Sequence, residues 1–203
     1  MSKNDYSAGM VSKPFLFVEF KKVIKLLHEG NSFADIKKLS LEKNIFGVSK
    51  EYRAKEIYNC VSHRAKTFDA DMIALFCLSD LATTKAMTLI AVLKTDRLFF
   101  EFLYEVYLEK IQLGIRVLED SDISIFFKNK QMQDENVSSW KDYTLIKLRN
   151  SYINYLRDAG LLTISSGKKK ITPPILDAAL EKYLINNKET QILKALTGVN
   201  FNV

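Results

Sequence analysis

The chain has 203 residues, and 47% of them are hydrophobic, which is enough to bury a sizeable core in one domain or two small ones. Its two cysteines, Cys60 and Cys77, are too few for a disulfide framework, so a reducing compartment is expected. No stretch approaches the roughly 20 apolar residues that a membrane span needs. Residues 1–13 also lack the apolar segment of a signal peptide, so we expect a cytoplasmic protein.

Two helices are predicted at the start of the chain. Apolar residues at helical spacing predict a helix over 15–29, and Pro14 suits its first turn. Ser32 and Asp35 resemble a capping box in which Asp replaces the usual Glu. They predict the start of a short second helix, which reaches about residue 43.

The next helix completes a helix-turn-helix outline. Residues 44–48 contain a glycine and indicate a turn, and Ser49 is the expected cap of a helix over 50–66. The turn is longer than the usual three to four residues or so, and two packed helices with no nucleic-acid role explain the pattern equally well. As a DNA-binding element, the second helix would make its contacts through Lys50, Lys55, Asn59 and Lys66.

The middle of the chain is predicted to be mostly core. Segments 71–78 and 81–94 are apolar nearly all round, which is typical of buried helices. Asp96 is the expected cap of a helix over 97–113, whose aromatic stripe indicates core packing. A further helix is predicted over 121–132.

The most informative helix is predicted over 141–159, and Gly160 is expected to end it. One face of this helix is apolar. The opposite face follows steps of four, three, four and three residues, and it holds two cations, two amides and a tyrosine but no acid. These residues are Tyr143, Lys147, Asn150, Asn154 and Arg157.

A small basic hairpin is predicted directly after this helix. Segments 161–165 and 169–172 read as short strands around a turn at 166–168. A helix, a glycine and a basic hairpin in this order are typical of a winged helix-turn-helix, whose helix enters the major groove while the wing touches phosphate. We therefore expect contacts to phosphate from Lys168, Lys169 and Lys170. The alternative is an ordinary amphipathic helix followed by a structural hairpin.

The net charge of +6 is unevenly distributed. Residues 12–68 carry 12 Lys and Arg against 6 Asp and Glu, and residues 138–172 carry 7 against 2. Residues 69–120 between them carry 5 against 9. Two basic blocks around an acidic middle favour a polyanion partner, although chance clustering of lysines is the alternative.

Nothing in the sequence recommends catalysis or metal binding. Cys60 and His63 have the spacing of two metal ligands, but a structural zinc site usually needs about four. There is no glycine-rich phosphate loop, nucleophile elbow or zinc-protease motif. We expect no enzyme activity, no metal and no cofactor.

The chain also resembles the BrxA family of BREX bacteriophage-exclusion systems. The resemblance is carried by Tyr6–Gly9, 53–64 (RAKEIYNCVSHR), 89–108 (LIAVLKTDRLFFEFLYEVYL), Trp140, Thr144 and Lys147, and 158–162 (DAGLL). It implies a small, helical, cytoplasmic and non-enzymatic component of an anti-phage operon, and it implies DNA binding. In such systems, other subunits carry the methyltransferase and ATPase chemistry.

Together these patterns predict a mostly α fold, a helical bundle with helix-turn-helix-like elements and one small C-terminal β-hairpin wing. We expect an N-terminal helical region over 1–120 and a winged-helix-like region over 121–203. The predicted function is binding of double-stranded DNA, with other BREX subunits as further partners. One alternative is a protein-protein adaptor within the defence complex. Another is RNA binding, which usually adds more exposed aromatic residues than Tyr143 alone.

Overall fold

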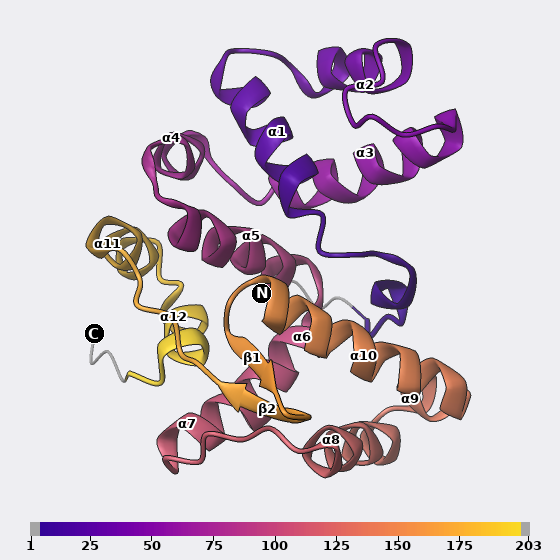
Figure 1. Cartoon of the computed structure of the whole chain (residues 1–203), viewed down its shortest axis with the longest axis vertical. Coiled ribbons are helices and arrows are strands. Elements are labelled where there is room, and N and C mark those ends of the chain that lie inside the picture. The colour runs from indigo at the N-terminus through magenta and orange to yellow at the C-terminus, as the bar shows by residue number, and fades with distance from the viewer. Residues whose placement is uncertain (1–4, 200–203) are drawn as a thin grey trace. The chain divides into compact units, whose positions relative to one another are not determined.

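The computed structural model describes residues 5–199, and in this part of the chain the fold is mostly helical with one two-stranded antiparallel sheet (Figure 1). The expected fold class is therefore confirmed. The chain divides into two compact units. The terminal unit joins the N-terminal segment up to Phe15 with the chain from Asp96 onward, and the inserted unit is Leu16–Thr95. The domain boundary expected at residue 120 stays a prediction.

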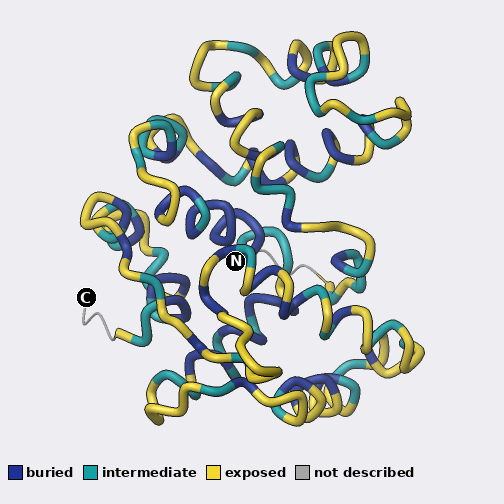
Figure 2. The backbone as a smooth tube through the Cα atoms, viewed as in Figure 1, coloured by how far each residue is buried: buried dark blue, intermediate teal, exposed yellow. Residues whose placement is uncertain are grey.

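The inserted unit consists of helices packed around a small aromatic cluster. Its elements are α1 (Phe17–His28), α2 (Phe33–Glu42), α3 (Glu51–Ala65), α4 (Ala70–Leu78) and α5 (Leu81–Thr95). α1 packs against α3 and α4, and α2 packs against α3. The ring of Phe20 lies edge-on to Phe68 and Phe76, with centroids 5.5 and 5.8 Å away. α5 is buried along most of its length, as its all-round apolar sequence predicts (Figure 2).

Local side-chain hydrogen bonds explain where several of these helices begin. Ser32 and Asp35 form the predicted capping box, because the Ser32 hydroxyl accepts from the Asp35 N–H and the Asp35 carboxylate accepts from the Ser32 N–H. The expected cap at Ser49 is wrong. α3 begins one residue later, after Lys50, and it has no side-chain cap. α1 also begins later than expected, at Phe17, because Leu16 adopts a left-handed conformation with φ of 56°.

The terminal unit holds the remaining elements. They are η1 (Gly9–Ser12), α6 (Arg97–Phe102), the π-helical turn η2 (Leu103–Tyr107), α7 (Leu108–Gln112), α8 (Asp120–Gln133), α9 (Glu135–Ser138), α10 (Asp142–Asp158), β1 (Leu162–Ser165), β2 (Lys168–Ile171), α11 (Ala178–Asn186) and α12 (Thr190–Thr197). α6, η2 and α7 follow one another without a break, so the predicted helix over 97–113 exists but widens by one π turn. Across residues 5–199, no helix is both long and apolar enough to span a membrane.

The core of the terminal unit is aromatic. Tyr152 of α10 lies at its centre, with ring centroids 4.7 Å from Phe99, 5.2 Å from Phe102 and 5.6 Å from Phe127. Tyr155 lies edge-on to Phe99 at 5.7 Å. Each such pair contributes roughly 0.5–1.5 kcal/mol beyond the burial of its area. This packing orients α10, because its inner face can bury these rings only in one rotation about the helix axis.

Candidate nucleic-acid interface

The outer face of α10 carries all five residues that the helical spacing places there. Tyr143, Lys147, Asn150, Asn154 and Arg157 are all exposed, and 65% of Tyr143 is accessible to solvent. The Lys147 ammonium lies over the Tyr143 ring, 4.4 Å from its centroid. Arg157 pairs with the neighbouring Asp158 at 3.0 Å. The outer face of this helix is therefore exposed and polar, and two of its five residues are cations.

The end of α10 is fixed by its backbone. Gly160 takes φ of 85°, the Leu161 N–H donates to the Leu156 carbonyl at 2.8 Å, and the Gly160 N–H donates to the Arg157 carbonyl at 3.0 Å. These bonds form a Schellman motif, which favours glycine at its left-handed position. The chain therefore turns at the predicted residue and enters β1 directly.

The hairpin is tighter than expected. Its register pairs Ser165 with Lys168, so the turn is the two residues Ser166 and Gly167 rather than 166–168. Both have positive φ, 49° and 76°, as a type I′ turn requires. Two-residue turns of this type are common in hairpins, because their backbone twist matches the right-handed twist of the two paired strands.

The three predicted lysines consequently lie on strand β2 rather than on the turn. Side chains alternate along a strand, so Lys168 and Lys170 are exposed on one face while Lys169 lies on the other. The Lys169 ammonium pairs with Asp120 at the first turn of α8 at 3.0 Å, and only 16% of its side chain is accessible. The sequence predicted three equivalent lysines. In the structure, Lys168 and Lys170 are exposed and Lys169 is paired with Asp120.

A third extended segment borders the hairpin. Val117 forms an isolated antiparallel bridge with Lys170. The Leu118 N–H donates to the Lys169 carbonyl and the Ile171 N–H to the Arg116 carbonyl, both at 2.9 Å. The sequence pattern did not indicate this segment. The terminal unit therefore runs in the order helix (α6 to α7), extended segment 116–118, helix α8, helix α10 and hairpin.

Two of the predicted residues of the inserted unit, Lys55 and Asn59, lie on the outer face of α3, and the other two, Lys50 and Lys66, flank its ends. Lys50, Lys55, Asn59 and Lys66 are all exposed. The Lys66 ammonium lies 5.6 Å from the centre of the Phe33 ring, and Lys50 lies 5.9 Å from that of Tyr52. These four residues belong to one unit and the α10 stripe to the other.

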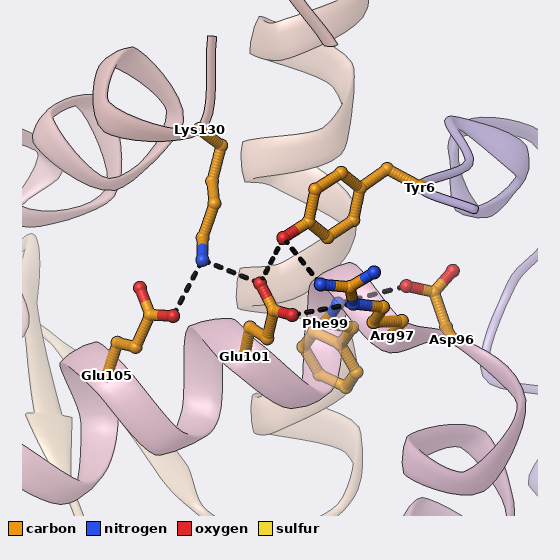
Figure 3. Close-up of polar contacts among 7 residues, drawn as sticks. All are labelled: Tyr6, Asp96, Arg97, Phe99, Glu101, Glu105 and Lys130. Carbon is orange, nitrogen blue, oxygen red and sulfur yellow. Dashed lines mark hydrogen bonds and ion pairs between the residues drawn. The ribbon is translucent and has the colours of Figure 1, made fainter. Parts of the chain in front are cut away.

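A charged cluster in the terminal unit was not predicted from the sequence (Figure 3). Glu101 accepts hydrogen bonds from Tyr6 and Lys130 at 2.6 Å and from Arg97 at 2.7 Å, and Lys130 also reaches Glu105 at 2.6 Å. Only 4% of Lys130 is accessible. Burial alone would raise the pKa of Glu101, but the hydrogen bonds from Lys130, Tyr6 and Arg97 hold it below its ordinary value. The pKa of Lys130 is raised because its two glutamate partners outweigh the effect of burial.

Comparison of the chain with known proteins identifies its family. The model of the BrxA family matches residues 4–188. The chain is 41% identical over 179 residues to the BREX protein BrxA of Bacillus cereus (strain H3081.97), covering 88% of this chain and 90% of that protein. The chain belongs to the BrxA family. The crystal structure of an uncharacterized protein from Magnetospirillum magneticum shares the fold of this BrxA-family chain with a TM-score of 0.81. The match covers 97% of this chain and 100% of that chain at 17% sequence identity, so it supports the fold alone.

The segments that carry the family resemblance occupy defined places in this BrxA-family structure. Tyr6 is bound in the charged cluster, and 158–162 forms the turn from α10 into the hairpin. Within residues 5–199, no three His, Cys, Asp or Glu side chains are grouped to hold a metal ion. Cys60 and Cys77 are free and half-buried, and burial raises the pKa of the Cys77 thiol.

Proposed function

We propose that this BrxA-family protein is a non-enzymatic, DNA-binding accessory component of a BREX anti-phage system. It binds duplex DNA through the outer face of α10 and through the exposed lysines of β2. The observation that carries the proposal is the open stripe of Tyr143, Lys147, Asn150, Asn154 and Arg157 on a helix that leads directly into a basic hairpin.

The order of elements in the terminal unit supports the proposal. A helix, a short extended segment, two further long helices and a hairpin that pairs with the extended segment are the order of a winged helix-turn-helix. In such a fold the last helix lies in the major groove, and the hairpin reaches the phosphate backbone. α10 takes the place of that last helix. The arrangement includes α6 to α7, so it begins before residue 121.

A salt-titrated binding experiment tests the proposal. Purified protein is mixed with duplex DNA, single-stranded DNA and RNA of matched length, and affinity is measured by anisotropy from about 50 to 200 mM salt. About four to six phosphate contacts predict a log–log slope near −4 to −5 for the duplex. Absence of duplex binding at low salt, or binding that ignores salt, contradicts the proposal. Tighter binding to RNA or to single strands favours the RNA-binding alternative.

The adaptor alternative also has an observation in its favour. Ile125 and Met132 lie seven residues apart on α8 and are both largely exposed. Contiguous exposed apolar patches mark protein-protein contacts, and these two side chains lie on one helix face, about two turns apart. Pairwise binding assays with the other purified BREX subunits test this reading, with the double variant Ile125→Glu and Met132→Glu as the control. A subunit that binds wild type but not this variant identifies α8 as a docking helix.

A further inference from the structure

The N-terminal segment 6–15 is bound tightly to the rest of the terminal unit, and its first anchor is Tyr6 (Figure 3). The Tyr6 hydroxyl donates to Glu101 at 2.6 Å, and the Arg97 guanidinium stacks on its ring, 4.5 Å from the centroid. The Asn136 side-chain amide donates to the Tyr6 carbonyl at 2.8 Å. The ring, the hydroxyl and the backbone carbonyl of Tyr6 are thus each held by a different contact.

The second anchor is at the other end of the segment. The Tyr155 hydroxyl lies 2.8 Å from the Lys13 carbonyl and 2.9 Å from the Pro14 carbonyl. Phe15 is 4% accessible, and its ring lies edge-on to Tyr155 at 5.5 Å. Between the anchors, η1 packs against α10 and buries Met10. The segment therefore runs along α10 as a fixed part of its surroundings.

A hollow of about 300 Å³ lies between this segment and the C-terminal half of α10. Its walls are residues 11–15 on one side and Ser151, Asn154, Tyr155, Arg157 and Asp158 on the other. The volume is at the small end of the range of about 300–1,000 Å³ found for ligand pockets. Its lining residues include two that carry a cation, Lys13 and Arg157, and one that carries a carboxylate, Asp158. Two members of the proposed DNA-binding stripe thus share a cavity with the N-terminal segment.

The donors in the hollow suit an anion. Asp158 accepts from Nε and one terminal nitrogen of Arg157, at 3.2 and 3.0 Å, and a guanidinium has five N–H donors in all. The Lys13 ammonium brings three donors, Asn154 an amide and Ser12 a hydroxyl. Lys13 and Ser12 are exposed, so an approaching ligand reaches them without rearrangement of the segment.

We infer that this hollow binds a backbone phosphate of duplex DNA, with Lys13 as a contact residue that the N-terminal segment adds to the interface. The inference rests on the proposed function, because it places a phosphodiester beside a helix that lies in the groove. The two anchors lower the conformational entropy cost of the contact, because a segment that is already ordered loses little freedom on binding.

The variant Lys13→Gln tests the inference, with Lys182→Gln as a matched control. Lys182 is also an exposed lysine of the terminal unit, but it lies on α11, which does not line the hollow. Loss of one phosphate contact predicts a salt slope shallower by about 0.9 for Lys13→Gln, with no change for Lys182→Gln. The affinity advantage of wild type over Lys13→Gln then shrinks about threefold to fourfold between about 50 and 200 mM salt.

Two further variants separate contact from structure. Lys13→Arg keeps the charge and is expected to keep the wild-type slope. Tyr6→Ala releases the first anchor while the second anchor still holds Lys13, so it is expected to keep most of the wild-type slope. A slope as shallow as that of Lys13→Gln would contradict a direct contact from the Lys13 charge. A wild type that binds duplex DNA while Lys13→Gln matches Lys182→Gln in slope overturns the inference and leaves the proposed function intact. A wild type that does not bind duplex DNA overturns both.

Discussion

Tyr107 joins the π-helical turn to the start of the hairpin, because its hydroxyl donates a hydrogen bond to the Leu161 carbonyl over 3.0 Å. The same carbonyl accepts from the Thr172 N–H at 2.9 Å. The Tyr107 ring is fully buried, and burial raises the pKa of its hydroxyl. Leu161 follows Gly160, so this hydrogen bond holds the point at which α10 passes into the hairpin.

Tyr107→Phe is expected to lower the free energy of unfolding by about 1 kcal/mol. The ring packing survives, and one hydrogen bond is lost. The Leu161 carbonyl keeps its bond from Thr172, so no buried acceptor is left alone. Urea unfolding measures the change, with Tyr104→Phe on the same π turn as the control. Equal stabilities for the two variants would show that the Tyr107 hydroxyl does not hold the junction.

The lysines of β2 are expected to separate into two kinds. Lys168→Ala with Lys170→Ala removes two exposed cations and is expected to flatten the salt slope by roughly two units, equally for all duplex sequences. Lys169→Ala is expected to change the slope less, because that ammonium already pairs with Asp120. Anisotropy titrations compare the three proteins. A larger slope change for Lys169→Ala than for the double variant would place the phosphate on the other face of the hairpin.

The two asparagines of α10 are expected to act on sequence preference rather than on salt dependence. An asparagine in the major groove can hold adenine by two hydrogen bonds. Asn150→Ala with Asn154→Ala is therefore expected to leave the salt slope nearly unchanged. On a preferred site, if selection from random duplexes finds one, it costs roughly 1–3 kcal/mol per lost base contact.

The opposite result would point to the inserted unit. If binding survives these changes in α10 and β2 but is abolished by Lys50→Ala with Lys55→Ala, the outer face of α3 is the main DNA-binding surface. Circular dichroism controls for folding in each variant, since all of these side chains except that of Lys169 are exposed.

The charged cluster predicts a pH dependence of stability. The folded-state pKa of Glu101 is lower than its ordinary value of 4.5. Its contribution is therefore present above about pH 4.5 and is lost as the pH falls through the folded pKa. Glu101→Gln is expected to be less stable than wild type at pH 7, and this difference is expected to shrink towards pH 3. Urea unfolding at pH 7, 5 and 3 checks this, with exposed Glu109→Gln as the control. A difference that stays constant with pH would mean that the Glu101 charge contributes nothing.

Local features were predictable because the sequence alone determines them. The stripe from Tyr143 to Arg157 follows from helical periodicity, and the Ser32–Asp35 capping box and the turn at Gly160 follow from short-range hydrogen bonds. In the cap and the turn the interacting residues lie within five positions of one another, and successive members of the stripe are three or four positions apart. The types and spacing of these residues are therefore enough to predict the local structure.

Long-range features were not predictable in the same way. The 116–118 segment makes one bridge and two hydrogen bonds, which is too short a stretch for alternation to be visible. The roles of Tyr6 and Lys13 depend on partners that lie more than 90 positions away in the sequence. Lys168 is exposed and Lys169 is paired because they lie on opposite faces of β2. The strand register, which the two-residue turn sets, decides which lysine lies on which face.

The division of the chain also imposes an order on its biosynthesis. The inserted unit is continuous, so all of its residues have left the ribosome once the chain has grown far enough past Thr95. The terminal unit is discontinuous, and Tyr6 cannot meet Asn136, nor Lys13 meet Tyr155, until those distant residues have been made. At about 5–20 residues per second, the N-terminal segment waits for several seconds or more without its partners. Docking of this segment is thus a late event in synthesis of the terminal unit, because it waits until Asn136 and Tyr155 have been made.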